Sequence, residues 1–195
     1  MIAMVDYGVG NLFSLKSSLA HLGLEAVVTA DPARLRAADR IILPGVGAFG
    51  DAMEKLTATG LVPVIKEETR KKPLLGICLG MQLLFEKSYE YGEHQGLGFV
   101  QGEVCPLEPD LKDPALKVPQ IGWNALHILR DDPLFQYIQE GEYVYYVHSY
   151  YGRHCTASTL AVSDYSIPVT GVVGRARCTA RSSTRRRAAT PGCGS

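Results

Sequence analysis

The stretch Leu74-Leu75-Gly76-Ile77-Cys78-Leu79-Gly80-Met81-Gln82 decides the fold of this 195-residue chain. An apolar run enters a Gly-x-Cys-x-Gly turn, and an apolar pattern with helical spacing follows it as far as Phe85. Such a turn is typical of a nucleophile elbow, because the glycines let neighbouring backbone pass close to the strained residue. The positive end of the following helix favours a thiolate. The pattern predicts that Cys78 is a nucleophile; the alternative is a small buried core residue between two glycines.

Length and composition are those of one soluble globular domain, with 46% hydrophobic and 21% charged residues. The longest apolar stretches have the length of strands, and no basic segment followed by a long apolar one begins the chain. We therefore expect neither a membrane span nor a signal peptide, and a cytoplasmic location. The five cysteines form no C-x-x-C pair and no His/Cys metal spacing, so we expect reduced thiols, no metal and no cofactor.

The formal net charge of zero hides an asymmetry along the chain. Residues 1–174 hold 14 Lys and Arg and all 20 acidic residues, whereas residues 175–195 hold six Arg and no acid. We expect residues 1–174 to form a single domain and 175–195 to be an aberrant, disordered tail. A basic arm for nucleic acid is the alternative interpretation of the tail, but the acidic balance of the body argues against a nucleic-acid partner.

Strands and helices alternate in the first half of the sequence, with strands predicted at 2–5, 25–28, 40–43 and before Cys78, and helices at 11–22, 51–56 and 62–70. This order predicts an α/β fold with a mostly parallel central sheet and helices on both faces. The loops 6–11, 44–49 and the elbow should then meet at one rim, at the carboxyl ends of the strands. Strand-like runs in the second half predict a smaller mixed or antiparallel portion on the same sheet, at 98–104, 122–126, 143–148, 158–162 and 169–173.

The segment Pro44-Gly45-Val46-Gly47 is either a simple tight turn or part of the reaction machinery. Acyl transfer to a thiolate creates an oxyanion that backbone N–H groups must stabilise. The elbow supplies one donor from Leu79, and a glycine loop after a neighbouring strand can supply another.

Five segments stand out together in residues 1–174: Asp6-Tyr7-Gly8-Val9-Gly10-Asn11, Pro44-Gly45-Val46-Gly47-Ala48-Phe49, Gly76-Ile77-Cys78-Leu79-Gly80-Met81-Gln82, Pro119-Gln120-Ile121-Gly122-Trp123-Asn124 and Val147-His148-Ser149-Tyr150. Together they resemble the glutaminase subunits of imidazole glycerol phosphate synthases, a family of class I glutamine amidotransferases. The elbow marks the broader superfamily, while the glycine loop and the Gly-Trp-Asn segment point to this family.

The resemblance implies a three-layer amidotransferase fold and hydrolysis of L-glutamine through a γ-glutamyl thioester on Cys78. Ammonia would pass to a cyclase subunit with a (β/α)8 barrel, in a heterodimer that makes imidazole glycerol phosphate and an aminoimidazole carboxamide ribotide in histidine biosynthesis. Site residues are implied by position: Val46, Gly47 and Leu79 for the oxyanion, Gln82, Ser149 and Tyr150 for glutamine, and Asn11, Gln120 and Trp123 near the partner.

The resemblance also implies a general base, the histidine of a late His-Pro-Glu motif that the glutamate orients. None of the five histidines in residues 1–195 is followed by Pro-Glu. His148 is the one tempting substitute, although the family pattern places it in a binding segment. We therefore expect the chain as written to be inactive. The alternatives are a non-catalytic docking partner of the cyclase and another class I glutaminase.

The arginine-rich tail suggests why the motif is missing. With suitable synonymous codons, residues 177–195 read in a shifted frame give Met-Tyr-Gly-Thr-Gln-Phe-His-Pro-Glu-Lys-Ser-Ser-Asp-Thr-Gly-Leu-Arg-Ile. For example, TCC-ACC-CGG-AGA for residues 183–186 contains CAC-CCG-GAG, which encodes the missing triplet. The first two bases of most codons are fixed by the protein sequence, so we hypothesise a frameshift near residues 175–177, in the gene or in its sequencing.

Overall fold

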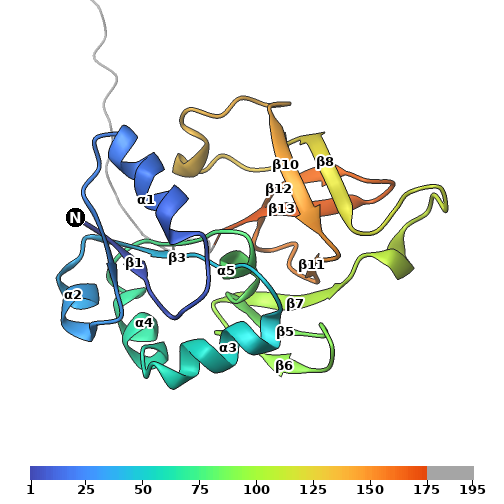
Figure 1. The fold of residues 1–195 in the computed structure, drawn as a ribbon. Coiled ribbons are helices and arrows are strands. Elements are labelled where there is room, and N and C mark those ends of the chain that lie inside the picture. The colour runs from blue at the N-terminus through green and yellow to red at the C-terminus, as the bar shows by residue number, and fades with distance from the viewer. Residues whose placement is uncertain (175–195) are drawn as a thin grey trace, which may run out of the picture.

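The computed structural model describes residues 1–174, so the predicted tail and the domain boundary before it lie outside the described residues. A parallel sheet forms the N-terminal half, with strand order β2-β1-β3-β4 (Figure 1). Its strands are β1 (Ile2–Val5), β2 (Ala26–Thr29), β3 (Arg40–Leu43) and β4 (Leu74–Gly76). All four residues of β1 are buried, as expected for a strand covered on both faces.

Helices cover both faces of this sheet, as the alternation of elements predicts (Figure 1). On one face, α1 (Leu12–His21) packs Leu19 against Met4 of β1. On the other face, Ala3 belongs to the main core together with residues of α2 (Pro32–Ala37), α3 (Phe49–Ala58) and α4 (Val62–Glu68). Since successive side chains of a strand point to opposite faces, β1 contributes side chains to the cores on both faces of the sheet. None of the helices within residues 1–174 is long and apolar enough to cross a membrane.

The second half forms three further sheets, mostly antiparallel. This confirms the predicted fold class, but these strands do not extend the parallel sheet as expected. One sheet holds β5 (Phe85–Ser88), β6 (His94–Gln95), β7 (Val100–Pro106) and β11 (Tyr150–Arg153). A two-stranded ribbon pairs β8 (Gln120–Ala125) with β10 (Tyr143–His148), and the third sheet holds β9 (His127–Ile128), β12 (Thr159–Asp164) and β13 (Pro168–Val173). Short 3-10 helices, η1 (Glu108–Asp110) and η2 (Pro133–Phe135), lie in the connections.

The helix expected after the elbow is a single turn, α5 (Leu79–Gln82), and the prediction that it continues to Phe85 is wrong. Residues 83–85 instead pair with the chain just before β7, where the Leu97 and Phe99 amides donate to the carbonyls of Leu83 and Leu84 at 2.9 and 2.8 Å. Leu83 and Phe85 are fully buried in the main core. Long-range pairing overrides the local pattern here, because a short apolar run fits a buried strand as well as a helix.

The three predicted loops meet at the carboxyl ends of β1, β3 and β4. The Tyr7 hydroxyl donates to the Pro44 carbonyl at 2.6 Å, which joins the first loop to the second. The Ile77 amide donates to the Leu43 carbonyl at 3.0 Å, which joins the elbow to the end of β3. The second loop starts there, and a Cβ atom on its Gly45 would lie 2.7 Å from the Gly80 nitrogen of the elbow. The prediction that these loops share one rim is confirmed.

Candidate active site

Cys78 lies at the turn between β4 and α5 with φ 56° and ψ −120°. This backbone conformation is uncommon for a residue with a side chain and is a feature of strained functional turns. The Cys78 side chain is exposed, whereas Cys105 and Cys155, the other cysteines of residues 1–174, are buried. Of these three thiols, Cys78 is the one that a substrate can reach, which argues against the buried core alternative.

The glycines on either side of Cys78 are required by close backbone contacts. A Cβ atom on Gly76 would lie 2.6 Å from the Gly80 carbonyl oxygen. A Cβ atom on Gly80 would overlap the Leu43 carbonyl oxygen at the end of β3. The turn therefore folds tightly against the neighbouring strand, as the Gly-x-Cys-x-Gly pattern predicts.

Support for a thiolate from a helix dipole is weaker than the sequence predicts. The Met81 and Gln82 amides donate to the Cys78 carbonyl at 2.9 and 3.2 Å, so the helix does begin at Cys78. However, α5 has only four residues and sums few peptide dipoles. The helix alone therefore gives little support to a thiolate at Cys78.

The glycine loop after β3 lies directly against the elbow. A Cβ atom on Gly45 would be 2.7 Å from the Gly80 amide nitrogen and 2.9 Å from Leu79 Cβ. Gly47 has φ 92°, which favours glycine, and the Val46 side chain is exposed. The structure thus brings together the two segments that carry Val46, Gly47 and Leu79; their use as oxyanion donors stays a prediction.

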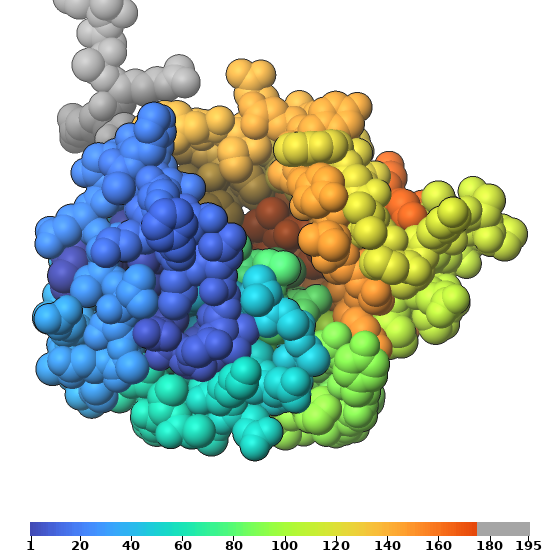
Figure 2. All heavy atoms as spheres, in the orientation of Figure 1, coloured from blue at the N-terminus to red at the C-terminus, as the bar shows by residue number. Residues whose placement is uncertain are grey.

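A cavity of about 310 Å³ opens beside Cys78, and its walls come from α5, β10, β11 and β13. Figure 2 shows the surface hollowed between the N-terminal half and the strands of the second half. Gln82 and Tyr150, two of the predicted glutamine-binding residues, line this cavity. They also contact each other, since Gln82 Nε2 donates to the Tyr150 carbonyl at 3.0 Å. Ser149, the third, lies beside the cavity, and its carbonyl accepts from the Leu107 amide at 2.9 Å.

Comparison with known proteins assigns the family. Residues 3–175 match the family model described as Glutamine amidotransferase class-I. The chain belongs to the class I glutamine amidotransferase family. Among its sequence relatives are two proteins named Imidazole glycerol phosphate synthase subunit HisH. The one from Wolinella succinogenes is 46% identical over 180 residues, which cover 90% of this chain and 86% of that protein. The one from Sulfurimonas denitrificans is 49% identical over 152 residues, covering 77% and 73%.

Solved structures agree with this assignment at the level of the fold. A crystal structure of a glutamine amidotransferase superposes with a TM-score of 0.65 at 17% identity, covering 87% of this chain and 83% of that one. The structure of PurLQS from Thermotoga maritima superposes with a TM-score of 0.61 at 20% identity, covering 86% of this chain and 76% of that one. The amidotransferase fold predicted from the sequence is therefore confirmed.

His148 lines the cavity of this amidotransferase, but both of its ring nitrogens are already engaged. Its Nδ1 lies 2.9 Å from the Tyr150 carbonyl oxygen and its Nε2 lies 3.0 Å from Gln120 Oε1. Both partner atoms are oxygens that only accept, so each contact needs a hydrogen on the ring nitrogen that makes it, and the neutral ring carries one such hydrogen. Burial lowers the pKa of His148, and the bond to Tyr150 opposes that shift. This geometry makes His148 a bridge between β8 and the Gln82–Tyr150 pair and gives no support to its use as a general base.

The predicted partner-facing residues have very different surroundings. Asn11 is exposed and caps α1, where its Oδ1 accepts from the Ser14 amide at 3.1 Å. Trp123 is 66% exposed and stacks edge to face with Tyr145 at 5.4 Å between ring centroids. Gln120, in contrast, is fully buried and bound to His148. Its side chain therefore lies inside the domain. The sequence pattern alone does not distinguish a buried residue at this position from one on the surface.

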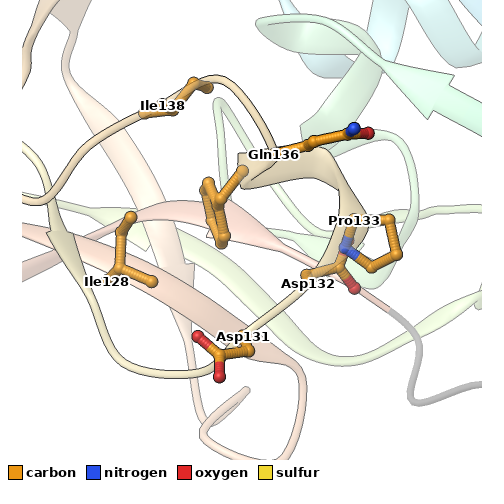
Figure 3. Close-up of a pocket in the computed structure, with 7 residues that line it drawn as sticks. Ile128, Asp131, Asp132, Pro133, Gln136 and Ile138 are labelled. Atoms are coloured by element: carbon orange, nitrogen blue, oxygen red, sulfur yellow. The ribbon is translucent and has the colours of Figure 1, made fainter. Parts of the chain in front are cut away.

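A second depression, of about 390 Å³, lies along the loop from β9 to η2 (Figure 3). Asp131 and Asp132 lie at its edge, and the Asp132 carboxylate caps η2 by accepting from the Leu134 amide at 2.9 Å. None of the residues predicted to carry the chemistry lines it. The cavity beside Cys78 is thus the candidate active site.

Sequence reasoning missed two residues that tether the glycine loop. Tyr7 binds the Pro44 carbonyl at the start of the loop, and Glu90 Oε2 accepts from the Phe49 amide at 2.7 Å at its end. The Asp6-Tyr7-Gly8 segment is recognisable in the sequence, but no local signal reveals the contact across 37 positions. Likewise, nothing near Glu90 in the sequence indicates its partner.

Proposed function

We propose that the chain is the glutaminase subunit of imidazole glycerol phosphate synthase. The role of this subunit is to hydrolyse L-glutamine and to pass the ammonia to the cyclase subunit. The observation that carries the proposal is the exposed Cys78, held at positive φ beside a cavity that Gln82 and Tyr150 line. The HisH relatives support this choice among the class I amidotransferases.

In the proposed reaction the Cys78 thiolate attacks the γ-carboxamide carbon of glutamine. The resulting oxyanion is stabilised by the backbone N–H of Leu79 together with those of the loop at Val46 and Gly47. The C–N bond then breaks, ammonia leaves after gaining a proton, and a γ-glutamyl thioester remains on Cys78. Water attacks the thioester, releasing glutamate and regenerating the thiol.

We further propose that the chain as written lacks the base for this reaction. The described chain ends at Gly174, and the preceding Gly171 and Val172 line the same cavity as Cys78. Residues 177–195 of the shifted reading frame follow this cavity wall closely in the sequence, which supports a His-Pro-Glu segment there as the missing proton acceptor. This interpretation rests on the frameshift hypothesis.

Protection of Cys78 by glutamine tests the proposed site in the 195-residue chain itself, without a need for turnover. Iodoacetamide alkylates exposed thiols, and a bound glutamine should block its approach to Cys78. We expect alkylation to slow about tenfold when glutamine is present at ten times its dissociation constant. Peptide mass spectrometry follows the modification of Cys78. Equal protection by asparagine, or none by glutamine, would contradict the proposal.

We propose that the cyclase docks on the apolar face of the β8–β10 ribbon. This face consists of exposed residues that share one side of the two strands: Ile121, Trp123, Tyr143, Tyr145 and Val147. An uncovered apolar surface of this kind is typical of protein interfaces, where Trp and Tyr contribute most of the affinity.

Trp123→Ala should weaken binding to the cyclase by about 2 kcal/mol, because a large aromatic contact is lost. Isothermal titration calorimetry measures the dissociation constant. Tyr137→Ala is the matched control, since Tyr137 is 87% exposed and lies outside this face. An unchanged affinity for Trp123→Ala would exclude this face. Cyclase binding without glutaminase activity in a chain with the restored frame would favour the alternative, a non-catalytic docking partner.

A further inference from the structure

Tyr7 is a buried tyrosine at the carboxyl end of β1, with 4% of its surface exposed. Its hydroxyl donates a 2.6 Å hydrogen bond to the carbonyl of Pro44, the residue that begins the loop after β3. A Cβ atom on Gly45 would lie 3.0 Å from this hydroxyl and 2.7 Å from the Gly80 nitrogen. Tyr7, the loop and the elbow therefore meet at one closely packed point.

The middle of the loop, Val46 and Gly47, is exposed and has few contacts to hold it in place. Gly45 and Gly47 give it a flexible backbone, and the exposed side chain of Val46 is 52% accessible to solvent. Its order must come largely from its ends, where Tyr7 fixes Pro44 and Glu90 fixes Phe49. Loss of the hydroxyl would leave the Pro44 carbonyl without this partner and allow the loop to move away from the elbow.

We propose that Tyr7 is a positioning residue for the oxyanion site: its hydroxyl holds the Pro44 carbonyl and thereby orients the N–H groups of Val46 and Gly47 toward Cys78. The inference deepens the proposed function and rests on it. Tyr7 acts through the loop and does not touch the substrate. Burial raises the pKa of Tyr7 to about 12, so the hydroxyl keeps its proton in any ordinary assay.

Two alkylating agents separate this role from a general effect on folding or on the thiol. A chloromethyl ketone analogue of glutamine reacts when the thiolate adds to its carbonyl, which forms an oxyanion, and the sulfur finally displaces chloride to leave a thioether. Iodoacetamide forms the same kind of thioether by direct displacement of iodide, without an oxyanion. At about pH 9 a free thiol is largely ionised, so neither reaction needs the missing base.

In the 195-residue chain, Tyr7→Phe should lower the rate of Cys78 modification by the chloromethyl ketone by at least about tenfold, while the iodoacetamide rate stays the same. Tyr137→Phe is the matched control and should change neither rate. Tyr7→Leu also removes the hydroxyl and provides the same readout if Tyr7→Phe does not fold, as judged by circular dichroism.

The ratio of the two rates decides the outcome. An unchanged ratio in a folded Tyr7 variant would overturn the inference, and so would an equal fall in both rates. If the unmutated chain reacts no faster with the glutamine analogue than with chloroacetone, the proposed glutamine site itself is wrong and the inference is overturned with it. If the unmutated chain does prefer the glutamine analogue to chloroacetone, but the ratio of the two alkylation rates is unchanged in the Tyr7 variant, only the role of Tyr7 is refuted.

Discussion

A chain whose residues 177–195 are replaced by the shifted-frame sequence should hydrolyse glutamine about 10²–10⁴ times faster than the 195-residue chain. The reason is proton transfer: Cys78 is exposed and close to the glycine loop, but within residues 1–174 the histidine beside it, His148, has both nitrogens engaged. The shifted frame supplies a histidine next to Pro-Glu, shortly after β13 in the sequence. Release of glutamate, measured with each chain bound to the cyclase, gives the comparison.

Two controls separate the base from a general gain in folding. The restored segment with its histidine changed to asparagine should fold equally well and lose most of the gained rate. Cys78→Ser in the restored chain should abolish the reaction. Turnover by the unaltered 195-residue chain at the level of the restored one would refute the missing-base account.

Gly80→Ala should destabilise the domain by about 3 kcal/mol or more. The added Cβ would overlap the Leu43 carbonyl oxygen, which already accepts from the Ile77 amide at 3.0 Å. Neither partner can move aside without separating β4 and its turn from β3. Urea unfolding followed by circular dichroism measures the loss of stability.

Gly23→Ala is the matched control for this substitution. Gly23 has φ 70°, and a Cβ there meets no atom within 4 Å, so the substitution adds backbone strain without a clash. We expect a cost of about 1 kcal/mol for Gly23→Ala. If Gly80→Ala lowers the free energy of unfolding by no more than Gly23→Ala does, the close approach of the elbow to β3 is not the reason that the elbow needs its glycines.

The sequence allows the first half of the fold and the tight turn at Cys78 to be predicted because both depend on local patterns. The strand at Arg40–Leu43 is found at its predicted bounds, and the strand before Cys78 follows as expected. Parallel strands place their carboxyl ends at one edge, so the meeting of the glycine loop and the elbow follows from topology alone. The helix Pro32–Ala37 was missed, although Asp31 as its N-cap and Pro32 at its first position are recognisable signals.

The rest of the site depends on contacts between residues far apart in the chain. The link from Tyr7 to Pro44 and the burial of Gln120 against His148 leave no periodicity in the sequence. Residues 83–85 look helical locally, yet the chain turns at Leu83 and Leu84 and becomes a strand at Phe85, where the segment before β7 pairs with it. The strands Tyr150–Arg153 and His94–Gln95 were likewise not predicted, since a short strand is identified by its partner more than by its own residues.

The most direct test of the central claim is to locate the covalent intermediate. The restored chain is mixed with the cyclase and glutamine, quenched in acid, digested and examined by mass spectrometry. We predict one γ-glutamyl group on the peptide that contains Cys78, and none on the peptides that contain Cys105 or Cys155. A γ-glutamyl group on another residue, or steady release of glutamate by the Cys78→Ser variant, would contradict the assignment of Cys78 as the nucleophile.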